Sequence, residues 1–388
     1  MARGEKPYRV YRGGRIRGPV PLERRRREDA KPGPEADGRA RYKGPGPKRR
    51  RRWTWRRGIL VGLLVLFLLV IVWGVASYLS FRSGVAAAND RLDRRTQRAL
   101  VPQSGLLLSK PTHILVMGTD HARTGGRRGL RHSDSIMVIR TDPDHHRLYY
   151  LSILRDLRVE VPGHGTQKIN AAFQFGGPSL AVRTVRAVTG LPINHVIIVD
   201  FADFRDLIDE LGGITVDVPR PILSNKFDCP YPRARCGRWP GWRFRKGKQK
   251  MDGRRALVYS RIRENRLNPA DSDASRAGRQ QQVVQAVSDK LTSPWTLLKL
   301  PFIGDDVPKP LATDMSAGQL IQFGWVKFRA GTTFHCRLGG EPAGGYIVQN
   351  EDSVKVLLMV KGRSAPQPPP PGNLFGSGCS RRLVLGAR

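Results

Sequence analysis

The sequence predicts an α/β domain, with helices packed against a β-sheet, behind a single membrane-spanning helix. Three observations support this fold class. Residues 58–80 contain no charge, and a basic segment rich in Pro and Gly precedes them. Downstream, short apolar strand patterns alternate with amphipathic helical patterns. Such alternation is typical of a sheet covered by helices.

The first segment, residues 1–57, is strongly basic. The whole chain has 68 Lys and Arg against 32 Asp and Glu, and this segment holds 21 of the former and 6 of the latter without any apolar period. We therefore expect a disordered tail. Two interpretations of its charge stay open: a nucleic-acid-binding arm, or a topology signal that also attracts anionic lipid. We favour the second and expect no nucleic-acid partner. The arginine excess elsewhere reflects codon bias or guanidinium groups that bind phosphate.

The next segment, "GILVGLLVLFLLVIVWGVASYLS" at 58–80, has 23 residues, enough to cross a hydrocarbon core of about 30 Å. The alternative is a cleaved signal peptide, but the apolar run is longer than such peptides need. The preceding "KRRRRWTWRR" places the N-terminus in the cytoplasm. The sequence thus predicts a single-pass protein of the cell membrane, with its folded domain outside and a linker or juxtamembrane helix at 81–110.

The strands and helices of the folded domain follow one another from residue 111. The expected strands are 113–119, 135–141, 147–153, 157–162, 195–200 and 214–219, with the turn "DPDHH" joining the second and third. The expected helices are 178–190, 201–213 and 275–291, and 251–263 begins as a helix and then becomes extended. We place the main domain at 111–292.

A C-terminal extension at 293–363 is expected to carry two helices, near 316–328 and 351–361, and a strand near 332–338. From Ser364 onward the proline run "APQPPPP" predicts a tail of polyproline II type, 364–388. Four cysteines are present, and their spacing does not suggest a zinc site. In an oxidising compartment Cys229–Cys236 and Cys336–Cys379 are possible disulfides, and free thiols are the alternative.

Acidic residues follow or precede three neighbouring strands. Asp120 comes just after the first strand, Asp134 just before the second, and Arg155 and Asp156 at the end of the third. If the first two strands are antiparallel, both aspartates share one sheet edge, where a hard cation such as Mg²⁺ would relieve their repulsion. The plainer interpretation is that each aspartate is a solvated turn or cap residue.

Arginines adjoin the same predicted elements. Arg261 and Arg263 are two apart in an extended segment, and Arg276 and Arg279 are three apart on a helix, so each pair shares a face. With Arg155 they suggest a cradle for a pyrophosphate. Alternatively, they are surface residues of an arginine-rich protein.

Six blocks in consistent order over about 111–292 closely resemble the LytR-CpsA-Psr family: "ILVMGTD", "RHSDSIMVIRTDP", "SILRDLRVEVPGHGTQKINAAFQFGGP", "VDFADFRDLIDELGGITVDVP", "MDGRRALVYSRIR" and "DSDASRAGRQQQ". Members of this family attach anionic glycopolymers, such as teichoic acid, from a polyprenyl-pyrophosphate carrier to peptidoglycan. The resemblance implies a three-layer α-β-α sandwich and a Mg²⁺-dependent (or Mn²⁺-dependent) phosphotransferase. It does not name the glycopolymer.

The resemblance also implies roles for residues. It puts Mg²⁺ at Asp120 and Asp134, makes Asp156 an orienting group, and assigns pyrophosphate binding or its support to Arg155, Arg261, Arg263, Arg279, Asn170 and Gln282. Arg276 joins this set by its helical face. One departure stands out, because His132 takes the place of a family arginine. Either Arg131, one residue earlier, binds the phosphate instead, or His132 takes a polar role, or that contact is missing. Two rival functions stay open: hydrolysis of the same lipid pyrophosphate, and a membrane-anchored regulator or binding protein without catalysis.

Overall fold

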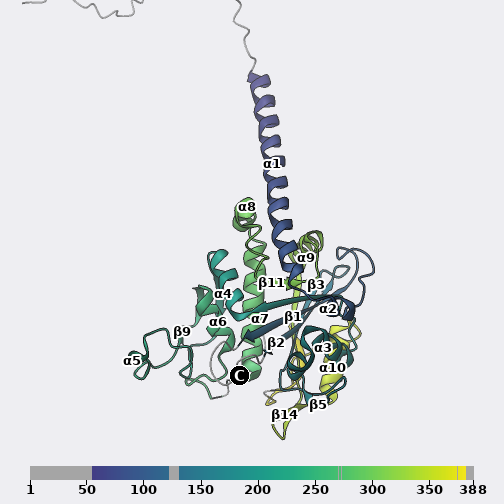
Figure 1. The fold of residues 1–388 in the computed structure, drawn as a ribbon, viewed down its shortest axis with the longest axis vertical. Coiled ribbons are helices and arrows are strands. Elements are labelled where there is room, and N and C mark those ends of the chain that lie inside the picture. Colours follow the sequence, from purple (N-terminus) through teal and green to yellow (C-terminus); the bar gives the residue numbers. More distant parts are fainter. Residues whose placement is uncertain (1–54, 122–130, 270, 272, 374, 382–388) are drawn as a thin grey trace, which may run out of the picture. The chain divides into compact units, whose positions relative to one another are not determined.

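The computed structural model describes residues 55–121, 131–269, 271, 273–373 and 375–381, without the side chains of 120, 121, 131, 132, 273 and 274. Residues 60–388 form one compact unit, and of the other unit, residues 1–59, only the last five are described. The expectations for the basic tail therefore lie outside the described residues. All elements below are labelled in Figure 1 where space permits.

A seven-stranded sheet is the centre of the domain, in the order β11-β6-β1-β2-β3-β12-β15. Its strands are β1 (Thr112–His121), β2 (Arg131–Asp142), β3 (Arg147–Ile153), β6 (His195–Asp200), β11 (Leu311–Thr313), β12 (Thr332–Leu338) and β15 (Gly378–Ser380). The β2–β3 pair is antiparallel, as its predicted turn requires, the β1–β2 pair is antiparallel too, and β1–β6 and β3–β12 are parallel. One end of the sheet therefore contains the C-terminal ends of β1, β3, β6 and β12 and the N-terminal end of β2. We call this end, where these strands start or finish, the site edge.

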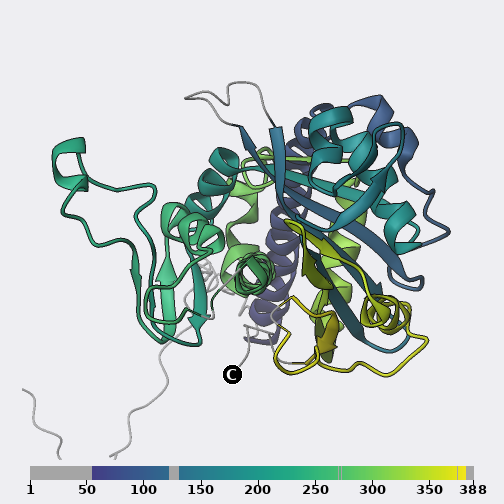
Figure 2. The ribbon, with the colours of Figure 1, turned by 90° about the horizontal axis from the view of Figure 1, so that it is seen from below.

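Helices cover both faces of this sheet (Figure 2). On one face lie α2 (Arg94–Ala99), α3 (Ala171–Thr189) and α10 (Glu351–Val360), which enclose a core with Leu115, Val138 and Leu151. On the other lie α7 (Asp273–Leu291) and α9 (Ala317–Arg329), packed on Ile114, Met137 and Tyr150. This arrangement confirms the predicted α-β-α sandwich.

A smaller subdomain surrounds a two-stranded ribbon of β7 (Ile214–Val218) and β10 (Gly247–Met251), beside α4 (Phe201–Glu210) and α6 (Gly253–Arg261). Asp200 and Asp252 cap these two helices, each accepting a backbone N–H. Between β7 and β10 the chain forms a long segment, residues 219–246, which we call the excursion. It contains the short elements β8 (Ile222–Leu223), α5 (Arg233–Cys236) and β9 (Arg243–Phe244). The sequence predicted the strand at 214–219 but not that it lies outside the main sheet.

Several further elements complete the chain. Helix α1 (Trp55–Asp90) is the one described helix that is long and apolar enough to cross a membrane. Two hairpins, β4 (Arg158–Val161) with β5 (Gly165–Lys168) and β13 (Glu341–Ala343) with β14 (Tyr346–Val348), lie near the site edge. Helix α8 (Pro294–Ile303) was not predicted.

The C-terminal segment is only partly the extended tail that the prolines predict. Residues 378–380 form β15, which pairs with β12, and Cys379 is disulfide-bonded to Cys336. Cys229 and Cys236 form a second disulfide. The prediction of a polyproline II tail was wrong for this part, because residues 378–380 form a strand, whereas the Cys336–Cys379 disulfide considered from the sequence is present and holds the segment against the sheet.

Candidate functional site at the sheet edge

Asp134 owes its position to an irregularity in the sheet. Gly118 pairs with Ser135 and Thr119 with Ser133, so Asp134 is the extra residue of a β-bulge in β2. Bulges redirect side chains and occur often beside active sites. Here the bulge places Asp134 in the wall of a pocket of about 470 Å³.

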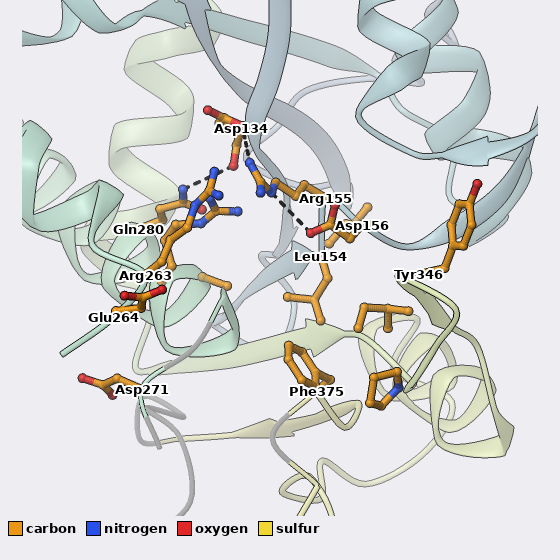
Figure 3. Close-up of a pocket in the computed structure, with 16 residues that line it drawn as sticks. Asp134, Leu154, Arg155, Asp156, Arg263, Glu264, Asp271, Gln280, Tyr346 and Phe375 are labelled. Carbon is orange, nitrogen blue, oxygen red and sulfur yellow. Dashed lines mark hydrogen bonds and ion pairs between the residues drawn. The ribbon is translucent and has the colours of Figure 1, made fainter. Parts of the chain in front are cut away.

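Arg155 links the carboxylates of this pocket (Figure 3). Its Nη1 donates to Oδ1 of Asp134 at 2.9 Å, and its Nε lies 3.4 Å from Oδ2 of Asp156. Asp156 also accepts a hydrogen bond from Lys168 Nζ at 2.9 Å. The side chains of Arg155 and Asp134 are 17% and 21% exposed, so solvent only partly screens their interaction. The sequence prediction that this strand end gathers acid and base is confirmed.

The remaining walls come from five other places in the chain. Arg263 and Glu264 follow α6, Arg276 and Gln280 project from the N-terminal end of α7, and Asp271 lies between these helices. The β13–β14 hairpin and Phe375 close the opposite side. The β13–β14 hairpin turns tightly at Gly344 and Gly345, whose positive φ angles suit glycine. The Ile347 N–H of this hairpin donates to the Asp156 carbonyl. The pocket thus combines cationic groups with an apolar wall of Ile153, Leu154, Ala277, Ile347 and Phe375.

Two of the predicted arginines do not line the pocket. Arg261 ends α6, pairs with Asp228 and lies 5.0 Å from the ring centroid of Phe201. The expected common face with Arg263 is wrong, because the helix extends through Arg261 and ends there. Arg279 is buried, 3.5 Å from Asp271, and donates to the Ile262 carbonyl. It thereby holds the segment that carries Arg263.

Two predicted supporting residues also lie outside the pocket lining. Gln282 accepts a hydrogen bond from the Tyr259 hydroxyl at 2.5 Å and donates to the Asp217 carbonyl, so it joins α7 to the subdomain. Asn170 precedes α3, and its backbone N–H donates to the Arg155 carbonyl at 3.3 Å. It therefore supports Arg155 through the main chain.

The proposed metal ligands are only partly described. The backbone places Asp120 opposite His132, two residues from Asp134, so both aspartates are at one end of the β1–β2 pair. The side chains of Asp120, Arg131 and His132 lie outside the described part. Among the described residues, no group of three His, Cys, Asp or Glu is placed to hold a metal ion. Two aspartate positions at one end of a strand pair nevertheless suit a hard cation that retains water and borrows substrate oxygens.

Several pocket residues were missed from the sequence. Gln280 donates to the Asp134 carbonyl at 3.4 Å, and its spacing of four from Arg276 is a signal that it shares that helical face. Tyr346 and Phe375 come from segments beyond the blocks of family resemblance, and no local pattern marks them. Lys168, which does not line the pocket but pairs with its Asp156, lies in a short strand without a distinctive pattern, and only the fold brings the two together.

Residues 75–330 match the LytR_cpsA_psr family, which is more than half of the chain, and the chain belongs to this family. It is 33% identical over 266 residues to the polyisoprenyl-teichoic acid–peptidoglycan teichoic acid transferase TagV of Bacillus subtilis (strain 168), which covers 67% of this chain and 65% of TagV. It is 30% identical over 213 residues to the regulatory protein MsrR of Staphylococcus aureus (strain COL), covering 54% of this chain and 58% of MsrR. The chain thus spans about two thirds or less of these relatives.

Among solved structures, TagT bound to LIIa-WTA superposes with a TM-score of 0.52 and 26% identity, covering 67% of this chain and 93% of TagT. This similarity supports the α/β fold class independently of the sheet analysis. The family expectation from the sequence blocks is confirmed.

Proposed function

We propose that this chain is a membrane-anchored phosphotransferase that moves an anionic glycopolymer from a polyprenyl-pyrophosphate carrier to peptidoglycan. The observation that carries the proposal is the Asp134–Arg155–Asp156 cluster, set in a pocket with Arg263 and Arg276. The similarity to TagV, a named teichoic acid transferase, supports this substrate class.

The chemistry follows from the kinds of groups in the pocket. A muramic acid hydroxyl attacks the phosphorus that bears the glycan, a new P–O bond forms, and the bond to the bridging pyrophosphate oxygen breaks. Prenyl monophosphate leaves, and the hydroxyl proton passes to a carboxylate of the site edge. Such a transfer needs positioning and charge neutralisation rather than a protein nucleophile. Arg155, Arg263 and Arg276 supply positive charge for the leaving phosphate.

Asp120 and Asp134 are the residues that would hold Mg²⁺ or Mn²⁺, which when bound would neutralise charge on the pyrophosphate. Arg155 keeps the Asp134 carboxylate oriented through their 2.9 Å hydrogen bond. Lys168 and Arg155 together hold Asp156, which limits the movement of the guanidinium. The cluster therefore presents a prearranged set of charges, which lowers the reorganisation needed during transfer.

The same proposal places the domain outside the cell membrane, with α1 as a single span and residues 1–57 in the cytoplasm. The apolar, exposed side chains of α1 support the span. Two disulfides suit an oxidising compartment. The basic residues before the span support this orientation.

The experiment is a product analysis with the full chain in lipid nanodiscs, Mg²⁺, a labelled glycan on polyprenyl pyrophosphate, and peptidoglycan fragments. Label on the fragments supports transfer. Release of free glycan phosphate with or without acceptor supports the hydrolase instead. Donor binding without either product, over several donor glycans, supports a binding protein.

A further inference from the structure

Helix α8 exposes an unusually large apolar surface to solvent. Its sequence, "PWTLLKLPFI", has one charge, on Lys299. Trp295 is 65% exposed, Leu298 58% and Phe302 81%. Burying such surface is worth about 25 cal/mol per Å², and contiguous apolar patches mark interaction sites. A solvent-facing helix of this composition indicates an apolar partner.

Helix α9 presents a second apolar face. Ile321, Trp325 and Phe328 recur at spacings of four and three, so they lie on one side, and Phe328 is 71% exposed. The opposite side of α9, with Leu320, Phe323 and Val326, packs on the sheet. Helix α9 is therefore apolar both toward the core and away from it. We call Trp295, Leu298, Phe302, Ile321, Trp325 and Phe328 the apolar collar.

The α8 part of the collar adjoins the membrane-spanning helix. Trp73 Nε1 of α1 donates to the Leu298 carbonyl at 3.2 Å. The backbones then touch: a Cβ on Gly304 would lie 3.0 Å from the Phe81 nitrogen, and one on Gly84 would lie 2.2 Å from the Asp305 oxygen. Helix α8 thus runs parallel to α1, from the level of Trp73 to that of Phe81 (Figure 1).

The contacts between α1 and α8 indicate how deep in a bilayer α8 would lie. Trp73 is seven residues before Ser80, the last residue of the uncharged run. At 1.5 Å per residue, that is about 10 Å along the span. Amphipathic helices that lie in a membrane interface bury their apolar side about 5–10 Å deep. If α1 crosses the bilayer, Leu298 lies beside its outer part.

We propose that α8 and the outer face of α9 form a docking surface that enters the outer leaflet of the lipid bilayer beside α1. The inference rests on the membrane anchoring proposed above, and it adds a second attachment to the single span. A lipid surface is the occupant, because the collar adjoins the span and carries tryptophans, which favour the membrane interface. The docked collar restricts rotation and tilt of the domain about α1.

Helix α7 connects this membrane attachment to the pocket. It leads from Arg276 and Gln280 in the pocket to the start of α8. Its 19 residues extend over about 28 Å at 1.5 Å per residue. The collar therefore fixes the distance of the charged site from the membrane surface.

The test uses the full chain in nanodiscs of phosphatidylcholine and phosphatidylglycerol, with single nitroxide labels on Phe302→Cys and Phe328→Cys. Leu66→Cys reports the span, and Val354→Cys, an exposed apolar position on α10, is the aqueous control. The native cysteines are paired in disulfides and do not take the label. We expect positions 302 and 328 to be reached by oxygen and shielded several-fold from a water-soluble nickel complex, relative to position 354.

Labels at 302 and 328 that behave like position 354, while position 66 is in lipid, would overturn the collar and leave the span and the transferase proposal intact. A water-accessible label at 66 would overturn the span and the collar together. A label-free version compares tryptophan quenching by lipids with brominated acyl chains. Trp295→Phe and Trp325→Phe should each lose part of that quenching, and unchanged quenching in both contradicts the proposal. Neither measurement depends on transfer activity.

Discussion

Arg155 Nη1 donates to Asp134 Oδ1 at 2.9 Å, so the end of β3 is tied to the bulge in β2. This contact joins two residues 21 positions apart in sequence and sets the charge pattern of the pocket. Because Asp134 is the extra residue of the bulge, its side chain does not follow the alternation of its strand. The positions of both groups thus depend on the β2–β3 register.

Arg276 is expected to contribute to donor binding. It lines the pocket from α7, and hydrogen bonds from charged groups are worth about 1.5–3 kcal/mol, so Arg276→Ala should weaken binding of polyprenyl pyrophosphate about tenfold or more. Calorimetric titration of the full chain in nanodiscs measures this. Arg183→Ala, an exposed position on α3, is the matched control. Equal affinity in both variants would remove Arg276 from the binding site.

Arg279 is expected to act mainly through the fold. Its ion pair with Asp271 is 2% and 1% exposed, and loss of one partner of a buried pair costs roughly 3–5 kcal/mol. Arg279→Ala should therefore lower the denaturation midpoint well below that of Arg183→Ala. Unchanged stability with lost donor binding would instead restore the direct ligand role that the family resemblance implies.

His335 is expected to make stability fall in acid. Burial beneath α7 lowers the pKa of His335 from 6.5 to about 4, and its Nδ1 lies 3.2 Å from Gln281 Oε1. The neutral form is favoured in the fold, so its contribution is complete above pH 6.5 and is lost as pH falls toward 4. By pH 4.5 the loss is roughly 2–3 kcal/mol. Denaturant midpoints at pH 7 and 4.5 should differ less in His335→Asn.

A second buried histidine, His113, limits how much of the acid sensitivity the His335→Asn substitution can remove. Burial, with the positive charge of Arg140, also lowers the pKa of His113 to about 4, so part of the acid sensitivity should persist in the variant. An acid sensitivity identical to that of the unchanged chain would contradict the burial argument for His335.

The two disulfides are expected to differ in their effect on stability. Cys336 and Cys379 are 43 residues apart, and Cys229 and Cys236 are seven apart. A larger closed loop restricts the unfolded chain more, so replacing both cysteines by alanine should cost about 4 kcal/mol for the first pair and about 2 kcal/mol for the second. Unfolding of the two double variants under oxidising conditions measures the difference. A larger loss for the 229–236 pair would contradict this account.

The sequence predicted the α/β fold class and the acid–base strand ends because both depend on local patterns, whereas the three-layer sandwich was implied by the family resemblance. Apolar alternation identified β1, β2 and β3, and a turn signal made the latter two a hairpin, which brings Asp134 to Arg155. The separation of Arg261 from Arg263 was not predictable, because it depends on where α6 ends. Arg261 is its last helical residue, and it pairs with Asp228 from the excursion.

Long-range parts of the site were beyond sequence reasoning for a similar reason. Tyr346 and Phe375 reach the pocket through β12, which adds a parallel strand to β3, and through the C-terminal segment bonded to it. No period or spacing within those segments indicates their destination. Helix α8 was missed because Pro294 and Pro301 interrupt its pattern, although proline at the first turn is compatible with a helix.

The most direct test of the central claim is the rate at which labelled glycan moves from polyprenyl pyrophosphate to peptidoglycan fragments in nanodiscs with Mg²⁺. The full chain, Asp134→Ala, Arg155→Ala and Arg183→Ala would be compared. We expect Arg183→Ala to match the unchanged chain, and the other two to lose about a hundredfold or more, as removal of a group that stabilises the transition state does. Transfer at the unchanged rate by both Asp134→Ala and Arg155→Ala would contradict a site at this sheet edge.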